Sequence, residues 1–73
     1  MNTLYLIGGS GFIGKNLVRC LSPFYSITVY DKYIDRVFFA SYPDVETHIL
    51  DLVREKLPVE KPTPDYIINL ASI

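Results

Sequence analysis

Residues 5–16, YLIGGSGFIGKN, join a short apolar run to a helical pattern through three evenly spaced glycines, Gly8, Gly11 and Gly14. The stretch fits three templates for phosphate-binding loops: G-x-x-G-x-x-G from Gly8, G-x-G-x-x-G from Gly9, and almost G-x-x-x-x-G-K-[ST] from Gly9. In all three, glycines let the backbone turn tightly, let a phosphate approach without meeting a Cβ atom, and let a helix pack close to its strand. Amide groups at the N-terminus of that helix then face the anion.

The residues on either side of the glycines predict a strand, a helix and a second strand. Residues 3–7 form an apolar run that ends at the glycines, which is typical of a strand buried on both faces. Residues 26–30 are rich in β-branched and aromatic residues, and they predict a second strand that ends at Asp31. Between them, residues 12–21 carry apolar side chains at the spacing of one helical face: Ile13, Leu17, Cys20 and Leu21.

The rest of the chain continues this alternation. The predicted elements are a short helix over 33–40, a strand over 45–50, a short helix over 51–57 that Pro58 ends, and a strand over 65–70. Strands that alternate with helices indicate βαβ units, and therefore a parallel sheet with right-handed crossovers. Because a buried parallel strand needs neighbours on both sides and helices on both faces, we expect the chain to be the first half of a larger domain.

Composition argues against several classes of function. With 73 residues, 49% of them hydrophobic, and a formal net charge of −1, the chain is one globular domain at most and is not basic enough to bind nucleic acid. The apolar N-terminal stretch is interrupted by glycines and has no Lys or Arg before Lys15, so we expect neither a membrane span nor a signal peptide, and a cytoplasmic location. Cys20 is the only cysteine, which excludes an internal disulfide and a multi-cysteine metal site, and we expect it to be a small core residue.

The residues that follow the glycines distinguish the three templates. The loop of NTPases needs a Ser or Thr hydroxyl that reaches Mg²⁺, and Asn16 stands in that place. A dinucleotide-binding loop needs an acidic residue about twenty residues further on, at the end of the second strand, to accept hydrogen bonds from ribose hydroxyls. Asp31 stands there. The pattern therefore favours a dinucleotide, with the amides of Phe12 and Ile13 on the pyrophosphate while their side chains pack.

Asp31 also affects the choice of cofactor. A carboxylate beside the ribose 2′ position accepts a hydrogen bond from a hydroxyl but repels a phosphate, so the sequence favours NAD over NADP. Lys32 and Arg36 follow closely and weaken this preference. We expect Lys15 to be solvated.

The sequence GGSGFIG after an apolar strand resembles the nucleotide-binding signature of the extended short-chain dehydrogenases/reductases, the NAD-dependent epimerase/dehydratase family. Further positions match this family in order: Asp31 after the second strand, Asp51-Leu52 after the third, and the fourth strand with its small-residue turn, DYIINLAS. The resemblance covers essentially the whole chain. Ile7 departs from it, because the family commonly has Thr before the first glycine.

The resemblance implies a Rossmann-type three-layer α/β fold, with a partial parallel sheet of strand order 3-2-1-4 and helices on both faces. Residues 1–73 would be the N-terminal half of a dinucleotide-binding domain, truncated before its catalytic and substrate-binding regions. The parent protein would be an NAD-dependent epimerase or dehydratase with a nucleotide-sugar substrate, and a homodimer is compatible with this. NAD is the implied cofactor, ahead of NADP, and no metal is implied. The implied cofactor-binding residues are Gly8, Gly11, Phe12, Ile13, Gly14, Asp31, Lys32, Asp51, Leu52, Leu70, Ala71 and Ser72.

Two alternative functions share these residues. The family's catalysis resembles hydride transfer assisted by a Tyr-x-x-x-Lys pair, and no Tyr of this sequence is followed four residues later by Lys. The chain alone is therefore predicted to bind a cofactor and not to catalyse a reaction. A reductase or dehydrogenase of the same family and a non-catalytic NAD-binding module remain open. A nucleotide-sugar pocket or a Tyr-x-x-x-Lys pair in downstream sequence would distinguish them.

Overall fold

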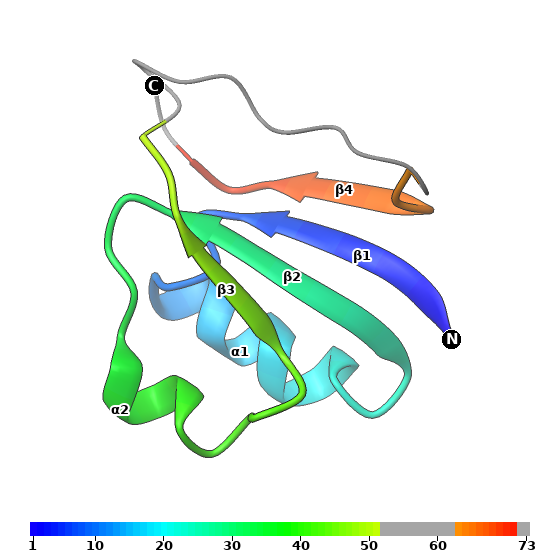
Figure 1. Cartoon of the computed structure of the whole chain (residues 1–73), viewed down its shortest axis with the longest axis horizontal. Coiled ribbons are helices and arrows are strands. Elements are labelled where there is room, and N and C mark those ends of the chain that lie inside the picture. Colours follow the sequence, from blue (N-terminus) through cyan, green and yellow to red (C-terminus); the bar gives the residue numbers. More distant parts are fainter. Residues whose placement is uncertain (52–62, 72–73) are drawn as a thin grey trace.

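The structure describes residues 1–51 and 63–71 of a computed structural model, in which strands and helices alternate over residues 2–49 and a further strand follows at 66–69. The elements are β1 (Asn2–Ile7), α1 (Phe12–Leu21), β2 (Tyr25–Asp31), α2 (Arg36–Phe39), β3 (Glu46–Ile49) and β4 (Tyr66–Asn69). Figure 1 shows the strands side by side in one twisted sheet.

The four described strands are parallel and lie in the order β3-β2-β1-β4. In the central strand β1, Leu6 lies opposite Val29 of β2 and opposite Ile68 of β4. The predicted α/β class and the parallel sheet of order 3-2-1-4 are therefore confirmed. Because all four strands run in the same direction, their carboxyl ends meet at one edge of the sheet.

The main hydrophobic core lies between the sheet and the two described helices. Alternate residues of β1 and β2 point to this face and pack against α1 and the region of α2. The buried members of the cluster are Leu4, Leu6, Val18, Ile27, Val29, Ile34 and Phe39. Burial of each large apolar side chain stabilises the fold by about 1.5–3 kcal/mol, so this face supplies most of the stabilisation.

Both described helices lie on the same face of the sheet (Figure 1). The crossovers from β1 to β2 and from β2 to β3 proceed in the same direction across the sheet, so right-handed connections place both helices on one side. The opposite face carries a smaller buried cluster of Tyr5, Ile7 and Tyr30. The sequence predicts helices on both faces, and the helix predicted over 51–57 lies, apart from Asp51, outside the described residues.

The buried face of α1 agrees only in part with the predicted one: Leu17 and Leu21 pack against the core, as predicted. Its buried residues are Gly14 and Val18, whereas Ile13 is 63% exposed and Cys20 is exposed. The predictions of Ile13 as a face residue and of Cys20 as a core residue are therefore wrong. Because Gly14 has no side chain, α1 packs closely against the preceding loop at this position. In the resulting orientation of the helix, positions 14 and 18 face the sheet.

The other elements begin and end near the predicted residues. α2 begins later than predicted, because Asp35 caps it by accepting a hydrogen bond of 3.1 Å from the backbone N–H of Phe38. β4 is more exposed than a central strand: Tyr66 and Ile67 are each about half exposed, since β4 lies at the end of the described sheet.

Candidate functional site

The glycine loop occupies the carboxyl edge of the sheet between β1 and α1. Gly8 has a φ of 82°, in the left-handed region that favours glycine, and its N–H donates a 2.8 Å hydrogen bond to the carbonyl of Tyr30. A Cβ atom at Gly8 would lie 3.0 Å from the backbone N of Ala71 and 3.1 Å from the carbonyl carbon of Leu70. The loop therefore turns sharply and lies directly against the end of β4.

Gly14 brings α1 into contact with this loop. A Cβ atom at Gly14 would lie 2.5 Å from Cα of Gly9 and 2.7 Å from the carbonyl oxygen of Gly8, far inside van der Waals contact. At Gly11, by contrast, the nearest atom to a Cβ would be the carbonyl oxygen of Gly8 at 3.7 Å, an ordinary contact. The fold therefore requires a glycine at position 14 but has space for a side chain at position 11.

The N-terminus of α1 is open to a ligand. Gly11 is the N-cap residue, no side chain caps the helix, and its first turn has no acidic residue. The first N–H groups of a helix have no partner within the helix, and they carry the positive end of its dipole. The amides of Phe12 and Ile13 are such groups. Their side chains are 83% and 63% exposed, so the prediction that these side chains pack is wrong for the described residues.

Asp31, the last residue of β2, lies beside the glycine loop. Its Oδ2 accepts a 3.1 Å hydrogen bond from the N–H of Ser10, and its Oδ1 accepts a 3.3 Å hydrogen bond from the N–H of Tyr33. Each carboxylate oxygen has two lone pairs, so these bonds leave room for two more donors. The carboxylate is part-buried and lies at the loop, which is where the sequence predicts it.

Ser10 joins the loop to the segment before α2, a contact that the sequence does not predict. Ser10 is 7% exposed, and its Oγ accepts a 2.8 Å hydrogen bond from the N–H of Asp35. The carboxylate of Asp35 in turn pairs with the ammonium of Lys15, with 2.5 Å between Oδ2 and Nζ. The hydrogen bond from Lys15, followed by that from the N–H of Phe38, lowers the pKa of Asp35. Lys15 is therefore paired and not simply solvated as predicted.

One signal for Asp35 is present in the sequence. An aspartate directly before a helical segment is a preferred N-cap residue, and Asp35 precedes the segment RVFF. Its pairing with Lys15 depends on how α1 is turned, which spacing alone does not reveal.

The remaining predicted site residues lie at the same edge or outside the described part. Leu70 donates a 2.8 Å backbone hydrogen bond to the carbonyl of Ile7, and Ala71 N–H donates to Oδ1 of Asn69 at 3.0 Å, which braces the turn after β4. Asp51 follows Leu50, whose N–H donates to the carbonyl of Asp31 at 2.8 Å. Lys32 is exposed. The predicted residues Leu52 and Ser72 lie outside the described residues.

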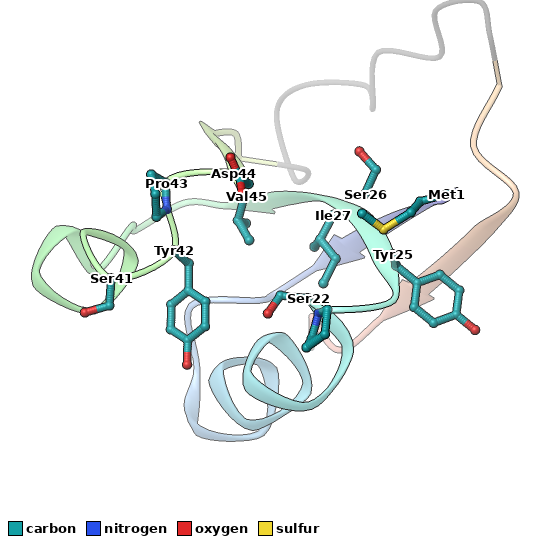
Figure 2. A pocket seen from close by; sticks show the side chains of 11 residues that line it. Met1, Ser22, Tyr25, Ser26, Ile27, Ser41, Tyr42, Pro43, Asp44 and Val45 are labelled. Carbon is teal, nitrogen blue, oxygen red and sulfur yellow. The ribbon is translucent and has the colours of Figure 1, made fainter.

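A surface hollow of about 280 Å³ lies at the opposite end of the sheet from the glycine loop, where the strands begin (Figure 2). Its lining includes Met1, Tyr25, Tyr42 and Val45. Met1 precedes β1, Tyr25 begins β2 and Val45 precedes β3, so the hollow lies at the amino ends of the strands. It shares no lining residue with the predicted site.

Within residues 1–51 and 63–71, no group of three or more His, Cys, Asp or Glu side chains is placed to hold a metal ion. No helix in this part of the chain is long and apolar enough to cross a membrane. Comparison of the chain with protein-family models, with curated proteins and with solved structures finds no significant match.

Proposed function

We propose that this chain binds the adenosine and pyrophosphate portion of a dinucleotide, as part of a Rossmann-type domain. The observation that carries the proposal is the hydrogen bond from Ser10 N–H to the Asp31 carboxylate. It shows the acidic residue and the glycine loop side by side at the carboxyl edge of a parallel sheet. A diphosphate at the loop and a ribose at Asp31 would then be neighbours, as they are in a dinucleotide.

The pyrophosphate would lie at the N-terminus of α1. The uncapped amides of Phe12 and Ile13 provide donors, and the absence of acidic residues from the first turn of α1 leaves the helix dipole unopposed. Gly11 keeps the approach clear of a side chain. The described residues therefore offer main-chain donors and a positive helix end to an anion.

The ribose and the adenine would lie toward β2 and β3. Asp31 would accept hydrogen bonds from the ribose hydroxyls through its remaining lone pairs. Asp51 would border the adenine, and Lys32 would flank the ribose from its exposed position. A carboxylate at this place favours the 2′-hydroxyl of NAD over the 2′-phosphate of NADP.

The path toward the nicotinamide would run between β1 and β4. Ligands of open parallel sheets bind where the strand order reverses, and here the chain moves from β1 outward to β3 and then returns to β4 on the other side of β1. Leu70 and Ala71 lie at this point, and Ser72 would follow them.

The parent protein would be an NAD-dependent epimerase or dehydratase that acts on a nucleotide sugar. The resemblance of GGSGFIG and DYIINLAS to that family supports this assignment. The residues of this chain would hold and orient the cofactor, and the chemistry that NAD would supply when bound is hydride transfer from and back to a sugar carbon. A reductase of the same family would use the same cofactor half.

Titration calorimetry of the chain with NAD tests the proposal, with Asp31→Ala as the probe. Loss of hydrogen bonds to a charged group costs about 1.5–3 kcal/mol, so we expect NAD to bind about 10- to 150-fold more weakly to the variant. Asp44→Ala is the matched control, because it removes the same charge from an exposed residue at the opposite edge. Equal NAD affinity for both variants and the unaltered chain, all folded by circular dichroism, would refute the role of Asp31.

A further inference from the structure

The ion pair between Lys15 and Asp35 is connected to Asp31 through Ser10, and the function proposed above does not use it. Resting on that function, we propose that Asp35 is a specificity-determining residue: it holds Lys15 away from the ligand and thereby denies this cation to a ribose 2′-phosphate. Asp31 would repel such a phosphate directly. Asp35 would act through Lys15, as a positioning residue.

A continuous set of contacts connects the two aspartates. The carboxylate of Asp31 accepts from the N–H of Ser10, and the hydroxyl of the same Ser10 accepts from the N–H of Asp35. The two aspartates therefore lie on the same flank of the glycine loop, joined through one residue. A ribose held by Asp31 would be close to the Lys15–Asp35 pair.

Lys15 would otherwise be suited to bind a phosphate. It follows Gly14 directly in the first helical turn of α1, the end of the helix that attracts anions. Its ammonium is engaged instead by the Asp35 carboxylate and lies 5.7 Å from the centre of the Phe38 ring. The side chains of Lys15 and Asp35 are 30% and 26% exposed, so the pair is partly shielded from solvent.

Three hydrogen bonds fix the position of Asp35 and therefore of its ion pair with Lys15. Its backbone N–H is bound to Ser10, its Oδ1 caps α2 through the N–H of Phe38, and its Oδ2 binds Lys15. An aspartate carboxylate is ionised at neutral pH, and the hydrogen bonds from Lys15 and Phe38 lower the pKa of Asp35 further. Lys15 is thus neutralised under the conditions in which a dinucleotide would bind.

The decisive variant is Asp35→Asn, which retains an oxygen for the N–H of Phe38 and the backbone bond to Ser10 but removes the charge that holds Lys15. We expect the affinity for NADP to rise about tenfold, or about 1.4 kcal/mol, while the affinity for NAD stays within about twofold. The double variant Lys15→Gln/Asp35→Asn should lose this gain. Lys15→Gln alone should give no gain and should weaken NADP binding, because it leaves the Asp35 carboxylate without its cation.

The controls separate this inference from the proposed function. Asp44→Asn removes the same charge at the opposite edge and should leave the ratio of NADP to NAD affinity unchanged. Asp35→Ser, which also supplies a capping oxygen, repeats the test should Asp35→Asn unfold. If NAD binds but Asp35→Asn leaves the affinity ratio unchanged, or the gain survives in the double variant, the inference is overturned and the proposed function stands. If the unaltered chain binds neither cofactor, both are overturned.

Discussion

Two glycines in the loop have different roles at the residue scale. Gly14 is required by packing, since a Cβ there would meet backbone atoms of Gly9 at 2.5 Å. Gly11 has space for a side chain within the protein, with its nearest neighbour at 3.7 Å. The fold thus requires Gly14, whereas Gly11, the N-cap residue of α1, is not required by packing and leaves space for a ligand.

Alanine at position 14 and serine at position 11 should therefore have different effects on stability. Gly14→Ala should lower the free energy of unfolding by about 3 kcal/mol, since backbone atoms cannot yield as a flexible side chain would. Gly11→Ser should leave it within about 0.5 kcal/mol, because serine is also a favourable N-cap residue. Urea unfolding measures both changes.

Titration calorimetry measures the effect of Gly11→Ser on the affinity for NAD. Gly11→Ser should weaken NAD binding by at least about tenfold, because its side chain would stand where the pyrophosphate approaches. A stable Gly11→Ser variant that binds NAD with unaltered affinity would contradict the placement of the pyrophosphate at this turn.

At the scale of elements, α2 depends on one ionised side chain. Asp35 caps this short helix and connects it to α1 through Lys15. Because its pKa is lowered in the folded chain, its carboxylate stabilises the fold above the ordinary aspartate pKa of about 3.9. This contribution is lost as the pH falls through the lowered pKa.

The stability difference between the unaltered chain and Asp35→Asn should follow this titration. We expect the chain with Asp35 to be the more stable one at about pH 6, and the difference to shrink or vanish at about pH 3. Urea unfolding at the two pH values gives the comparison. A difference of the same size at both pH values would show that the charge of Asp35 does not stabilise α2.

The hydrophobic pattern of each segment predicts the position of α1 and of the strands along the chain better than it predicts which of their residues face the core. The apolar spacing of residues 12–21 locates α1 correctly but selects Ile13 and Cys20 as buried. The close contact at Gly14 overrides that pattern, because the helix turns its smallest side toward the loop. A hydrophobic pattern gives no weight to glycine, and Gly14 packs closely because it has no side chain.

At the scale of the whole molecule, the alternation of strands and helices predicts the parallel sheet, and the family resemblance implies its strand order. The proximity of Asp31 to the glycine loop could also be predicted, since both lie at the carboxyl ends of neighbouring parallel strands. The network of Ser10, Asp35 and Lys15 could not, because its ion pair joins elements twenty positions apart, and that pairing depends on the final rotation of α1. The sequence therefore predicts the backbone of the site better than its side-chain contacts.

The location of binding is the central claim, and amide chemical shifts during a titration with NAD test it most directly. We predict the largest changes at residues 9–14 and 31–33, around the loop and the end of β2. Changes concentrated instead around the hollow of Figure 2, at residues 22–26 and 41–45, or no changes at saturating NAD, would contradict it.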